Sequence, residues 1–519
     1  MEDIKKQIQE HEVSSGYKDH NNNTPIIKTT VEYDKNDPRH FVKVKVEATI
    51  DGVTRKLSQE VVVNSYPDVL NYAAGSEGNL IINGSPYFIG GGLYAGNELR
   101  IKNQAEYQYK SRDKREATIF PSLVGTAFVQ SLNKIKYCEG DNCNGSNYTS
   151  VREASGDSEK KDVKSIIGDT SSTQIKNEKE FLGINMTESF IDKLNEAISG
   201  KEQERASMKN IFKENGSGIR ELMKYVEASN KLILSPVPPI ENSVQSADET
   251  SYLKDLKTYK DKINSSLELE NESILHRGNF NLDNVDFTQL SYTRADSETG
   301  KMLRKSLGGG YYHSNWFIID GDLNILNNTS DFVNVRANIL VTGNVNISGN
   351  VKMDATIFAL GETNILDANI QGLDDKELVL MSKGKILITR VNTNVDGSFK
   401  AIPLDPGDII TNSLNGNLTR LDAFFYTDST AELYGVGSIF WIKGGFFSKG
   451  DLTINAVRGS AEVSSDGMKI ESEFPQTSIP GNRARFIVYY NNDIFNDQSA
   501  ALPRVKSYNL IRGKKIMNK

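Results

Sequence analysis

The chain has 519 residues, in which 61 Lys and Arg face 68 Asp and Glu, so the formal net charge is −7. A protein dedicated to nucleic acids needs a basic face that displaces counterions, and this mildly acidic balance argues against that class. Hydrophobic residues make up 37% of the chain, which is enough for folded cores and argues against wholesale disorder. No run of about 18 apolar residues occurs, so we expect no membrane span in this chain.

The first residues are polar and charged and lack the apolar h-region of a secretory signal. We predict a polar N-terminal stub over residues 1–25, with a short helix at Asp3–Glu12. Two interpretations stay open: the protein is cytoplasmic, or a leader or membrane anchor lies upstream of Met1.

Residues 26–74 form a predicted β-hairpin region. From Val42 to Ile50, apolar and polar side chains alternate with the period of two that a half-buried strand shows. Asp51-Gly52 follows at once, and this pair is a strong signal for a two-residue hairpin turn.

The strongest pattern lies further along the chain, where the odd positions from Val333 to Ile365 hold apolar residues or glycine, except for Thr363. This alternation is too long for one strand, since strands usually run about three to ten residues. Glycine-led segments punctuate it, and the intervals from Gly321 to Gly343 and from Gly343 to Gly361 are 22 and 18 residues. Short in-phase strands at such a period are typical of a β-solenoid, in which each coil stacks on the next.

We therefore predict a mainly β fold: a parallel β-solenoid with an inserted small α-helical domain and an N-terminal β-hairpin region. The main solenoid spans residues 276–475, and a first solenoid segment spans 75–149. Its Gly-Asn segments at 78–101 match the pattern and could form earlier coils of the same stack. An antiparallel sandwich is the alternative, since it gives a similar alternation with longer turns.

Residues 150–275 form the predicted α-helical insertion. Asn185 and Glu188 are spaced like an N-cap residue and its partner, and an apolar stripe at helical spacing follows them. Two further stripes run through Met208–Val226 and Tyr252–Leu267. Residues 476–519 complete the chain as a C-terminal strand and a basic tail that contains Arg512, Lys514, Lys515 and Lys519.

The two cysteines, Cys138 and Cys143, cannot build a four-ligand zinc site and miss the Cys-x-x-Cys redox spacing. We predict a local disulfide between them, with two free thiols in a reducing compartment as the alternative. The five histidines are scattered singly and are interpreted as surface or packing residues: His11, His20, His40, His276 and His313. The prediction for metal ions and cofactors is none.

A catalytic constellation needs a nucleophile, a base and an orienting group, or a metal, and no such set stands out. We therefore predict no catalytic residues. The enzyme alternative is a polysaccharide-acting β-helix that pairs carboxylates on an outer face of its coils. Its candidate carboxylates are Asp320, Asp322, Asp354, Glu362, Asp367, Asp374 and Asp375.

Two resemblances accompany these residues. The segment 316–372, with Gly-Asn-Val-Asn-Ile-Ser-Gly-Asn-Val-Lys, resembles bactofilin-type polymer-forming β-helices. Over most of the chain, the segments Tyr66–Ala74, Ala423–Asp428 and Gly444–Phe447 resemble PilX-like pilus-assembly surface proteins of Bacillus-type Gram-positive bacteria. Such proteins usually begin with a short leader and one apolar pilin-like helix, which this chain lacks.

The sequence thus predicts a non-enzymatic protein of the cell surface or a pilus, structural or adhesive in role and extracellular in location. The expected partners are pilin subunits or cell-surface polymers, without nucleic acid. The alternatives are an intracellular bactofilin-like scaffold that polymerises end to end and the polysaccharide-acting enzyme.

Overall fold

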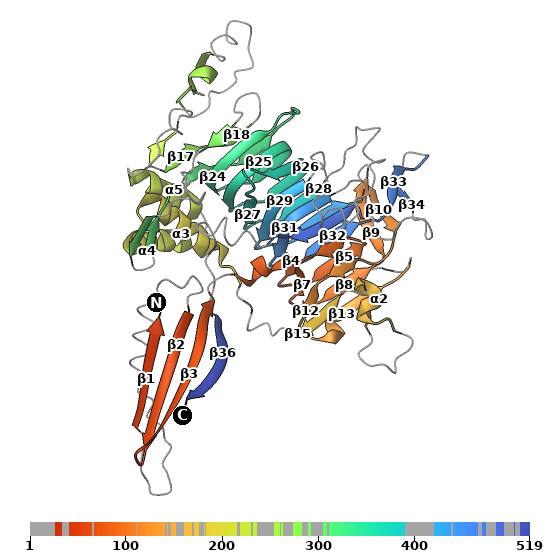
Figure 1. The fold of residues 1–519 in the computed structure, drawn as a ribbon. Helices are drawn as coiled ribbons and strands as arrows, with labels where there is room; N and C mark the ends of the chain where they lie inside the picture. The colour runs from red at the N-terminus through yellow and green to blue at the C-terminus, as the bar shows by residue number, and fades with distance from the viewer. Residues whose placement is uncertain are drawn as a thin grey trace. The chain divides into compact units, whose positions relative to one another are not determined.

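The computed structural model divides the chain into two compact units, one of Met1–Pro67 with Val505–Lys519 and one of Asp68–Arg504 (Figure 1). The structure describes residues 26–33, 41–64, 67–109, 112–140, 143, 147–151, 160–168, 171–175, 181, 183–214, 218–229, 232–235, 254–259, 261–262, 273–282, 289–291, 305–308, 311–389, 420–436, 440–465, 470–473, 484–491, 503 and 509–518. The predicted helix at Asp3–Glu12 lies outside these residues, as do His11, His20 and His40. None of the described helices is long and apolar enough to cross a membrane.

The first unit is an antiparallel sheet in the order β1-β2-β3-β36, built from β1 (Ile26–Tyr33), β2 (Phe41–Ile50), β3 (Val53–Asn64) and β36 (Asn509–Asn518). The predicted hairpin at Asp51-Gly52 is confirmed, because both residues adopt positive φ angles, 50° and 76°. The predicted basic tail is wrong over β36, which pairs with the edge of β3 and satisfies its backbone groups. The 26–74 boundary is also too late, since residues from Asp68 onward belong to the second unit.

The second unit contains a set of parallel strands, here called the parallel stack, whose neighbours pair in three columns. Column A consists of β17 (Ile274–Arg277), β22 (Phe317–Asp320), β24 (Val333–Val341), β25 (Val345–Ala359), β27 (Leu378–Ser382), β29 (Arg420–Thr427), β31 (Phe440–Ser448), β4 (Tyr72–Ser76), β7 (Gly92–Ala95), β12 (Thr126–Val129) and β15 (Ser172–Ile175).

Column B consists of β18 (Phe280–Leu282), β23 (Leu323–Leu326), β25, β26 (Thr363–Gly372), β28 (Ile386–Thr389), β30 (Ala431–Gly435), β32 (Leu452–Ala456), β5 (Leu80–Gly84), β8 (Leu99–Lys102) and β13 (Ile135–Cys138). Column C consists of β19 (Gln289–Ser291), β24, β25, β26, β29, β31, β35 (Phe486–Tyr490), β6 (Tyr87–Ile89) and β11 (Ser122–Val124). Long strands such as β25 bend from one column into the next.

The prediction of a mainly β fold is confirmed, and the neighbouring strands of the parallel stack after Val333 run in the same direction. Leu323 pairs with Val345 and Val345 with Thr363, which reproduces the intervals of 22 and 18 residues seen in the sequence. An antiparallel sandwich is therefore excluded for this region. The odd-numbered side chains point inward: Val333, Val335, Ala337, Ile339 and Val341 are fully buried in one continuous core.

A coil is here the stretch of chain that contributes one strand to each column, and the order of the coils along the stack differs from their order along the chain. The sequence pattern places residues 75–149 before the other coils. Their region instead pairs with the last coil, since β4, β5 and β6 pair with β31, β32 and β35. The strands of residues 72–138 therefore continue the stack beyond its last coil, and Figure 1 shows this red-orange region beside the blue strands. The strand β35, predicted as part of the C-terminal segment 476–519, belongs to this junction.

The helices of the insertion cover the outer side of column A. They are α3 (Met186–Ile198), α4 (Glu202–Glu214) and α5 (Gly218–Ala228), and the predicted N-cap is confirmed because the Asn185 side chain accepts a hydrogen bond from the Glu188 N–H. Their apolar residues share one cluster with outward-facing side chains of the strands, among them Leu340, Phe358 and Tyr426. The apolar stripe of each helix is buried against the sheet, and this packing stabilises helices that would be only marginally stable alone.

Both ends of the inner core are covered by helical segments. At one end α2 (Val163–Ile167) buries Ile166 and Ile167 in the core, and Asp162 caps this helix. At the other end residues 254–259 are helical, and Tyr259 packs into the same core as Ile274. Stacked repeats need such caps because the terminal coils would otherwise expose their apolar interior.

The remaining described strands and short helices lie at the edges of the stack. They are η1 (Asp68–Asn71), the antiparallel pair β9 (Gln104–Tyr109) and β10 (Arg112–Ala117), η2 (Leu132–Lys134), β14 (Thr149–Ser150), β16 (Ile233–Leu234), the pair β20 (Lys305–Gly308) and β21 (Tyr311–His313), and the pair β33 (Ser460–Val463) and β34 (Ile470–Glu473). The predicted helical insertion of 150–275 thus also holds β15, β16 and the first residues of β17.

Candidate functional site

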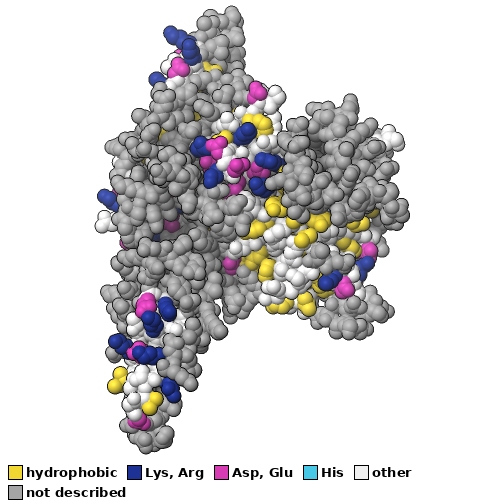
Figure 2. Space-filling model, in the orientation of Figure 1, with side chains coloured by type: hydrophobic (Ala, Val, Ile, Leu, Met, Phe, Trp, Pro, Cys, Tyr) yellow, Lys and Arg dark blue, Asp and Glu magenta, His cyan; other side chains and the backbone are white. Residues whose placement is uncertain are grey.

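Several of the sequence-predicted carboxylates are tied to arginines. Arg336 joins Asp354, at an Nε–Oδ2 distance of 3.0 Å, to Asp374. Arg277 joins Asp320, at an Nη1–Oδ2 distance of 3.0 Å, to Glu227. Figure 2 accordingly shows acidic and basic side chains intermixed over β24 and β25.

The other predicted carboxylates lie at corners of the stack. An oxygen of Asp322 accepts the backbone N–H of Asn344 at 2.7 Å, and the backbone N–H of Glu362 donates to the side chain of Asn344 at 2.8 Å. Asp367 and Asp375 adopt left-handed φ angles of 49° and 59°, which short polar side chains tolerate. Turn formation accounts for these positions.

Column B carries a ladder of asparagines on its outer face. The side-chain amide of Asn324 donates to Asn281, that of Asn346 to Asn324, and that of Asn364 to Asn346, with N–O distances of 2.8, 2.8 and 3.0 Å. The middle rungs, Asn324 and Asn346, thereby both donate and accept from one coil to the next. The abundant asparagines serve this stacking, while the described non-glycine residues with left-handed φ are aspartates: Asp51, Asp367, Asp374 and Asp375.

A polar cleft of about 820 Å³ lies on the outer face of column B where the two halves of the stack meet. Its floor comes from β5, β8, β30 and β32, and its walls come from β9 and β10 and from Cys143 and Tyr148. The lining residues are Ile81, Asn83, Arg100, Lys102, Glu106, Tyr107, Asp113, Lys114, Arg115, Cys143, Tyr148, Glu432, Tyr434, Thr453 and Asn455. The volume matches that of pockets for small ligands, which span about 300–1,000 Å³.

The hairpin is fixed to the floor by polar and apolar contacts. The backbone N–H of Glu106 donates to Asn455 Oδ1 at 3.2 Å, and that same oxygen accepts from Asn83 Nδ2 at 2.9 Å. Tyr107 and Ala105 are buried in a small apolar cluster with Val436 and Val457. The wall therefore has a defined position over the floor.

Cations line the cleft and share acidic partners. Glu106 Oε1 receives Lys102 Nζ at 2.7 Å and Arg115 Nε at 3.4 Å. Arg100 pairs with Glu98 at 2.8 Å. Burial opposes ionisation of Glu98, but hydrogen bonds from Lys136 and Arg100 outweigh burial and lower its pKa.

Two tyrosines, Tyr148 and Tyr434, line the cleft. Burial, reinforced by Glu432, raises the pKa of Tyr434 to about 12. Burial also raises the pKa of Tyr148, whose ring faces the guanidinium of Arg100 at 5.9 Å. Both phenols are therefore protonated near neutral pH and can donate hydrogen bonds.

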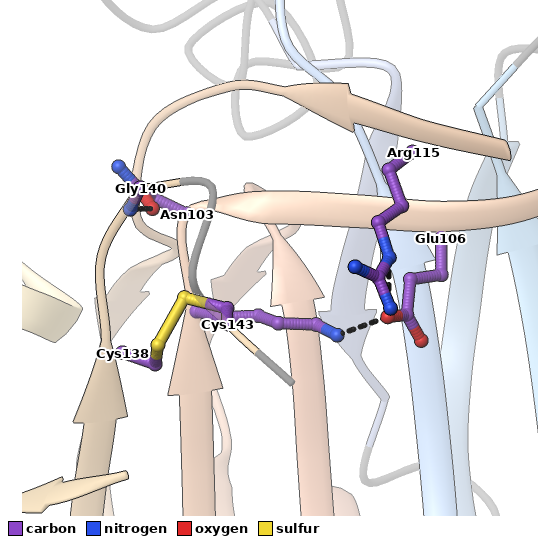
Figure 3. Close-up of a disulfide and its surroundings, with 7 residues drawn as sticks. Asn103, Glu106, Arg115, Cys138, Gly140 and Cys143 are labelled. Carbon is purple, nitrogen blue, oxygen red and sulfur yellow. Dashed lines mark hydrogen bonds and ion pairs between the residues drawn. A yellow bond between two sulfur atoms is a disulfide. The ribbon is translucent and has the colours of Figure 1, made fainter. Parts of the chain in front are cut away.

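A disulfide joins Cys138, at the end of β13, to Cys143, which lines the cleft. Figure 3 shows this bond beside the Glu106–Arg115 pair and the contact in which the Gly140 N–H donates to Asn103 Oδ1 at 3.0 Å. The bond closes the short loop and so limits its freedom at the cleft. Of the lining residues, the sequence patterns pointed to Cys143 alone.

His276 is a fully buried packing residue of β17. Its Nε2 contacts the carbonyl oxygen of Asn279 at 3.3 Å, and its Nδ1 lies 2.6 Å from Ser235 Oγ. Because a carbonyl only accepts, Nε2 carries the proton and Nδ1 accepts from the serine hydroxyl. Burial lowers the pKa of this imidazole. Among the described residues, no group of three or more His, Cys, Asp or Glu could hold a metal ion.

No protein-family model matches the chain, and no curated protein matches it. Among solved structures, the competence-associated pilin ComZ from Thermus thermophilus is similar over 97% of this chain and 86% of its own, with 13% sequence identity and a TM-score of 0.31. A likeness at this level carries no argument about fold or function.

Proposed function

We propose that this protein is a non-enzymatic structural or adhesive protein of the bacterial cell surface or a pilus, and that its parallel stack is a β-solenoid serving as a platform. The observation that carries this proposal is the continuous backbone ladder of column A, which runs from β17 through β31 and β4 to β15. The helices α3–α5 form a side module on this platform.

The chemistry of the predicted carboxylates supports a structural role. A hydrolytic pair needs one carboxyl group with a raised pKa and one free carboxylate, with room for water or sugar between them. Here Asp354 and Asp374 share Arg336, which would have to give up both partners before either could act.

The disulfide supports an extracytoplasmic location, since such bonds persist in oxidising compartments and are rare in the cytosol. The end caps favour a discrete molecule over the end-to-end polymer of a bactofilin-like scaffold. Both α2 and the helix at 254–259 cover apolar core that such a polymer would have to expose and pair. The PilX-like segments of the sequence support pilin subunits or cell-surface polymers as partners.

The test uses the full chain in its oxidised form. We expect it to co-sediment with cell-wall polymer or to bind isolated pilin subunits, to remain monodisperse alone, and to release no sugar from polysaccharide. Filaments of the purified protein would favour the scaffold, and release of reducing ends would favour the enzyme. Either result contradicts the proposal.

A further inference from the structure

The cleft beside the disulfide contains more cationic side chains than carboxylates to pair with them. Its four cations, Arg100, Lys102, Lys114 and Arg115, face three carboxylates, Glu106, Asp113 and Glu432. Glu106 already serves two cations, and Glu432 accepts from Lys385 at 3.1 Å, outside the cleft.

Lys114 is the cation of the cleft that this network of ion pairs does not include. It is half-buried on β10, opposite Tyr107, and no carboxylate pairs with it within the part of the chain that the structure describes. A ligand anion that reaches the ammonium group of Lys114 gains a charge-assisted hydrogen bond.

A second observation comes from the floor. Asn83 is 2% exposed, and its Oδ1 has no hydrogen-bond partner among the described residues, while its Nδ2 is held by Asn455. An unpaired buried amide oxygen is costly. The atom is closed off from solvent, so a hydroxyl group of a ligand would satisfy it by displacing the side chains that cover it. Asn83 on the floor therefore favours a ligand hydroxyl group, and Lys114 on the wall favours a ligand anion.

The tyrosines add an apolar component. Tyr148 and Tyr434 line the same cleft, and aromatic rings offer a flat surface to the C–H face of a sugar while their hydroxyl groups bind its oxygens. A ligand that combines hydroxyl groups, C–H faces and a negative charge meets all three requirements.

We infer that this cleft binds an acidic saccharide, with its carboxylate at Lys114 and a ring hydroxyl at Asn83. The disulfide loop, through Cys143, is the wall that keeps the cleft in shape. This inference deepens the proposed adhesive function and rests on it for the extracellular presentation of the ligand.

The experiment measures binding of a hyaluronan tetrasaccharide to the full oxidised protein by calorimetry and saturation-transfer NMR. The matched ligand is the same tetrasaccharide with its carboxylates methyl-esterified, which keeps the hydroxyl groups and removes the charge. We expect the ester to bind at least about tenfold more weakly, the loss expected for one charge-assisted hydrogen bond. This comparison needs no variant and so is independent of folding.

The variant Lys114→Gln should weaken the acidic tetrasaccharide by a similar factor and leave the ester unchanged. Lys164→Gln removes a lysine of the exposed surface of α2 and should bind as the parent protein does. The double variant Cys138→Ser/Cys143→Ser should weaken both ligands, because it frees the wall rather than the anion site. Equal affinity for acid and ester, or an unchanged Kd in Lys114→Gln, overturns the inference.

Inorganic phosphate serves as the remaining probe, and complete displacement of the tetrasaccharide by millimolar phosphate would reduce the cleft to a simple anion site and also overturn the inference. The outcome is separable from that of the proposed function. If the protein binds cell-wall polymer or pilin but does not bind the tetrasaccharide, only this inference is overturned. Cleavage of a bound tetrasaccharide removes the non-enzymatic function and leaves the ligand class standing.

Discussion

Two regions of the parallel stack have the same pairing but different connections. From β22 to β32 each coil is followed in the chain by the coil that lies on it. At the junction, β31, β32 and β35 meet β4, β5 and β6 with the same parallel register, although hundreds of residues separate the partners in sequence. Stacking thus depends on the matched faces of two coils, and chain continuity is not required.

The junction also carries bonds of its own. Asp451 accepts the backbone N–H of Asn79 at 2.9 Å, Asn83 donates to Asn455, and Ser76 Oγ donates to the carbonyl of Gly450 at 2.6 Å. These contacts repeat the polar rungs of the continuous coils. If the two regions are equivalent, matched substitutions should cost the same free energy of unfolding in each.

Glycines at coil corners give the largest expected effect. Gly84, at the junction, has φ +92°, and a Cβ there would lie 2.0 Å from the carbonyl oxygen of Ala456; Gly349, within the continuous coils, has φ +75° and a Cβ position 1.8 Å from that of Asn327. We expect Gly84→Ala and Gly349→Ala each to lower the free energy of unfolding by about 3–5 kcal/mol, from left-handed strain plus overpacking.

The matched control is Gly52→Ala in the first unit, where φ is +76° but nothing lies within 4 Å of the added Cβ. It should cost only about 1–2 kcal/mol, the conformational part alone. Urea unfolding followed by circular dichroism provides the comparison. If Gly84→Ala lowers the free energy of unfolding no more than the control does, while Gly349→Ala lowers it by the full amount, the junction is packed less tightly than the continuous coils.

Arg458 provides the next test, because it joins three coils at the junction. Its Nε donates to the carbonyl of Ser85 at 3.1 Å, its Nη2 donates to Ser122 Oγ at 2.9 Å, and its guanidinium faces the ring of Tyr87. Burial lowers its pKa to about 10, so the charge costs stability that these bonds offset.

We expect Arg458→Met to destabilise the second unit by about 2–4 kcal/mol, since the buried carbonyl of Ser85 and the partly buried hydroxyl of Ser122 lose their donor. Arg458→Lys, which can reach one of them, should fall between Met and the parent protein. Thermal unfolding measures both. A methionine variant as stable as the parent would mean that apolar packing alone closes the junction.

The alternation of Val333–Val341 was enough to predict parallel stacking, because the inward positions of every coil must be apolar. The outward positions are polar except where the helices cover them, as at Leu340. The coil order could not be predicted, since every coil offers the same apolar interior and the same backbone pairing to a neighbour above or below. Sequence patterns therefore place β4 equally well on β17 or on β31.

The cleft was missed for a related reason. Glu106 and Asn455 are 349 residues apart, and each occurs within an ordinary run of polar residues. Only the junction brings β5 and β8 beside β30 and β32. The charged run of β9–β10, from Glu106 to Arg115, was the available signal, but its place in a wall follows from long-range pairing.

The buried imidazole of His276 on β17 tests the stability of the first coil of column A, far along the stack from the junction. Its pKa is lowered from the reference value of 6.5, because burial disfavours the charged form. Its contribution to stability is therefore complete at high pH and is lost as pH falls below about 6.5, where the unfolded chain takes up the proton first.

The free energy of unfolding should accordingly fall more steeply between pH 7.5 and 5 in the parent protein than in His276→Gln, which does not titrate. Other groups contribute equally to both proteins and cancel in the difference. Parallel pH profiles of the two would contradict a neutral buried imidazole.

The smallest effect concerns the asparagine ladder of the continuous coils. Asn346 is a middle rung that donates to Asn324 and accepts from Asn364, whereas Asn364 donates to Asn346. At about 0.5–1.5 kcal/mol for each hydrogen bond, Asn346→Ala should cost about twice as much as Asn364→Ala. Equal costs in urea unfolding would mean that solvent replaces the lost bonds, and the ladder would then fix the register of the coils without stabilising them. Asn83→Ala extends the test to the junction, where it removes one bond to Asn455 together with an unpaired buried oxygen, so it should cost less than Asn364→Ala.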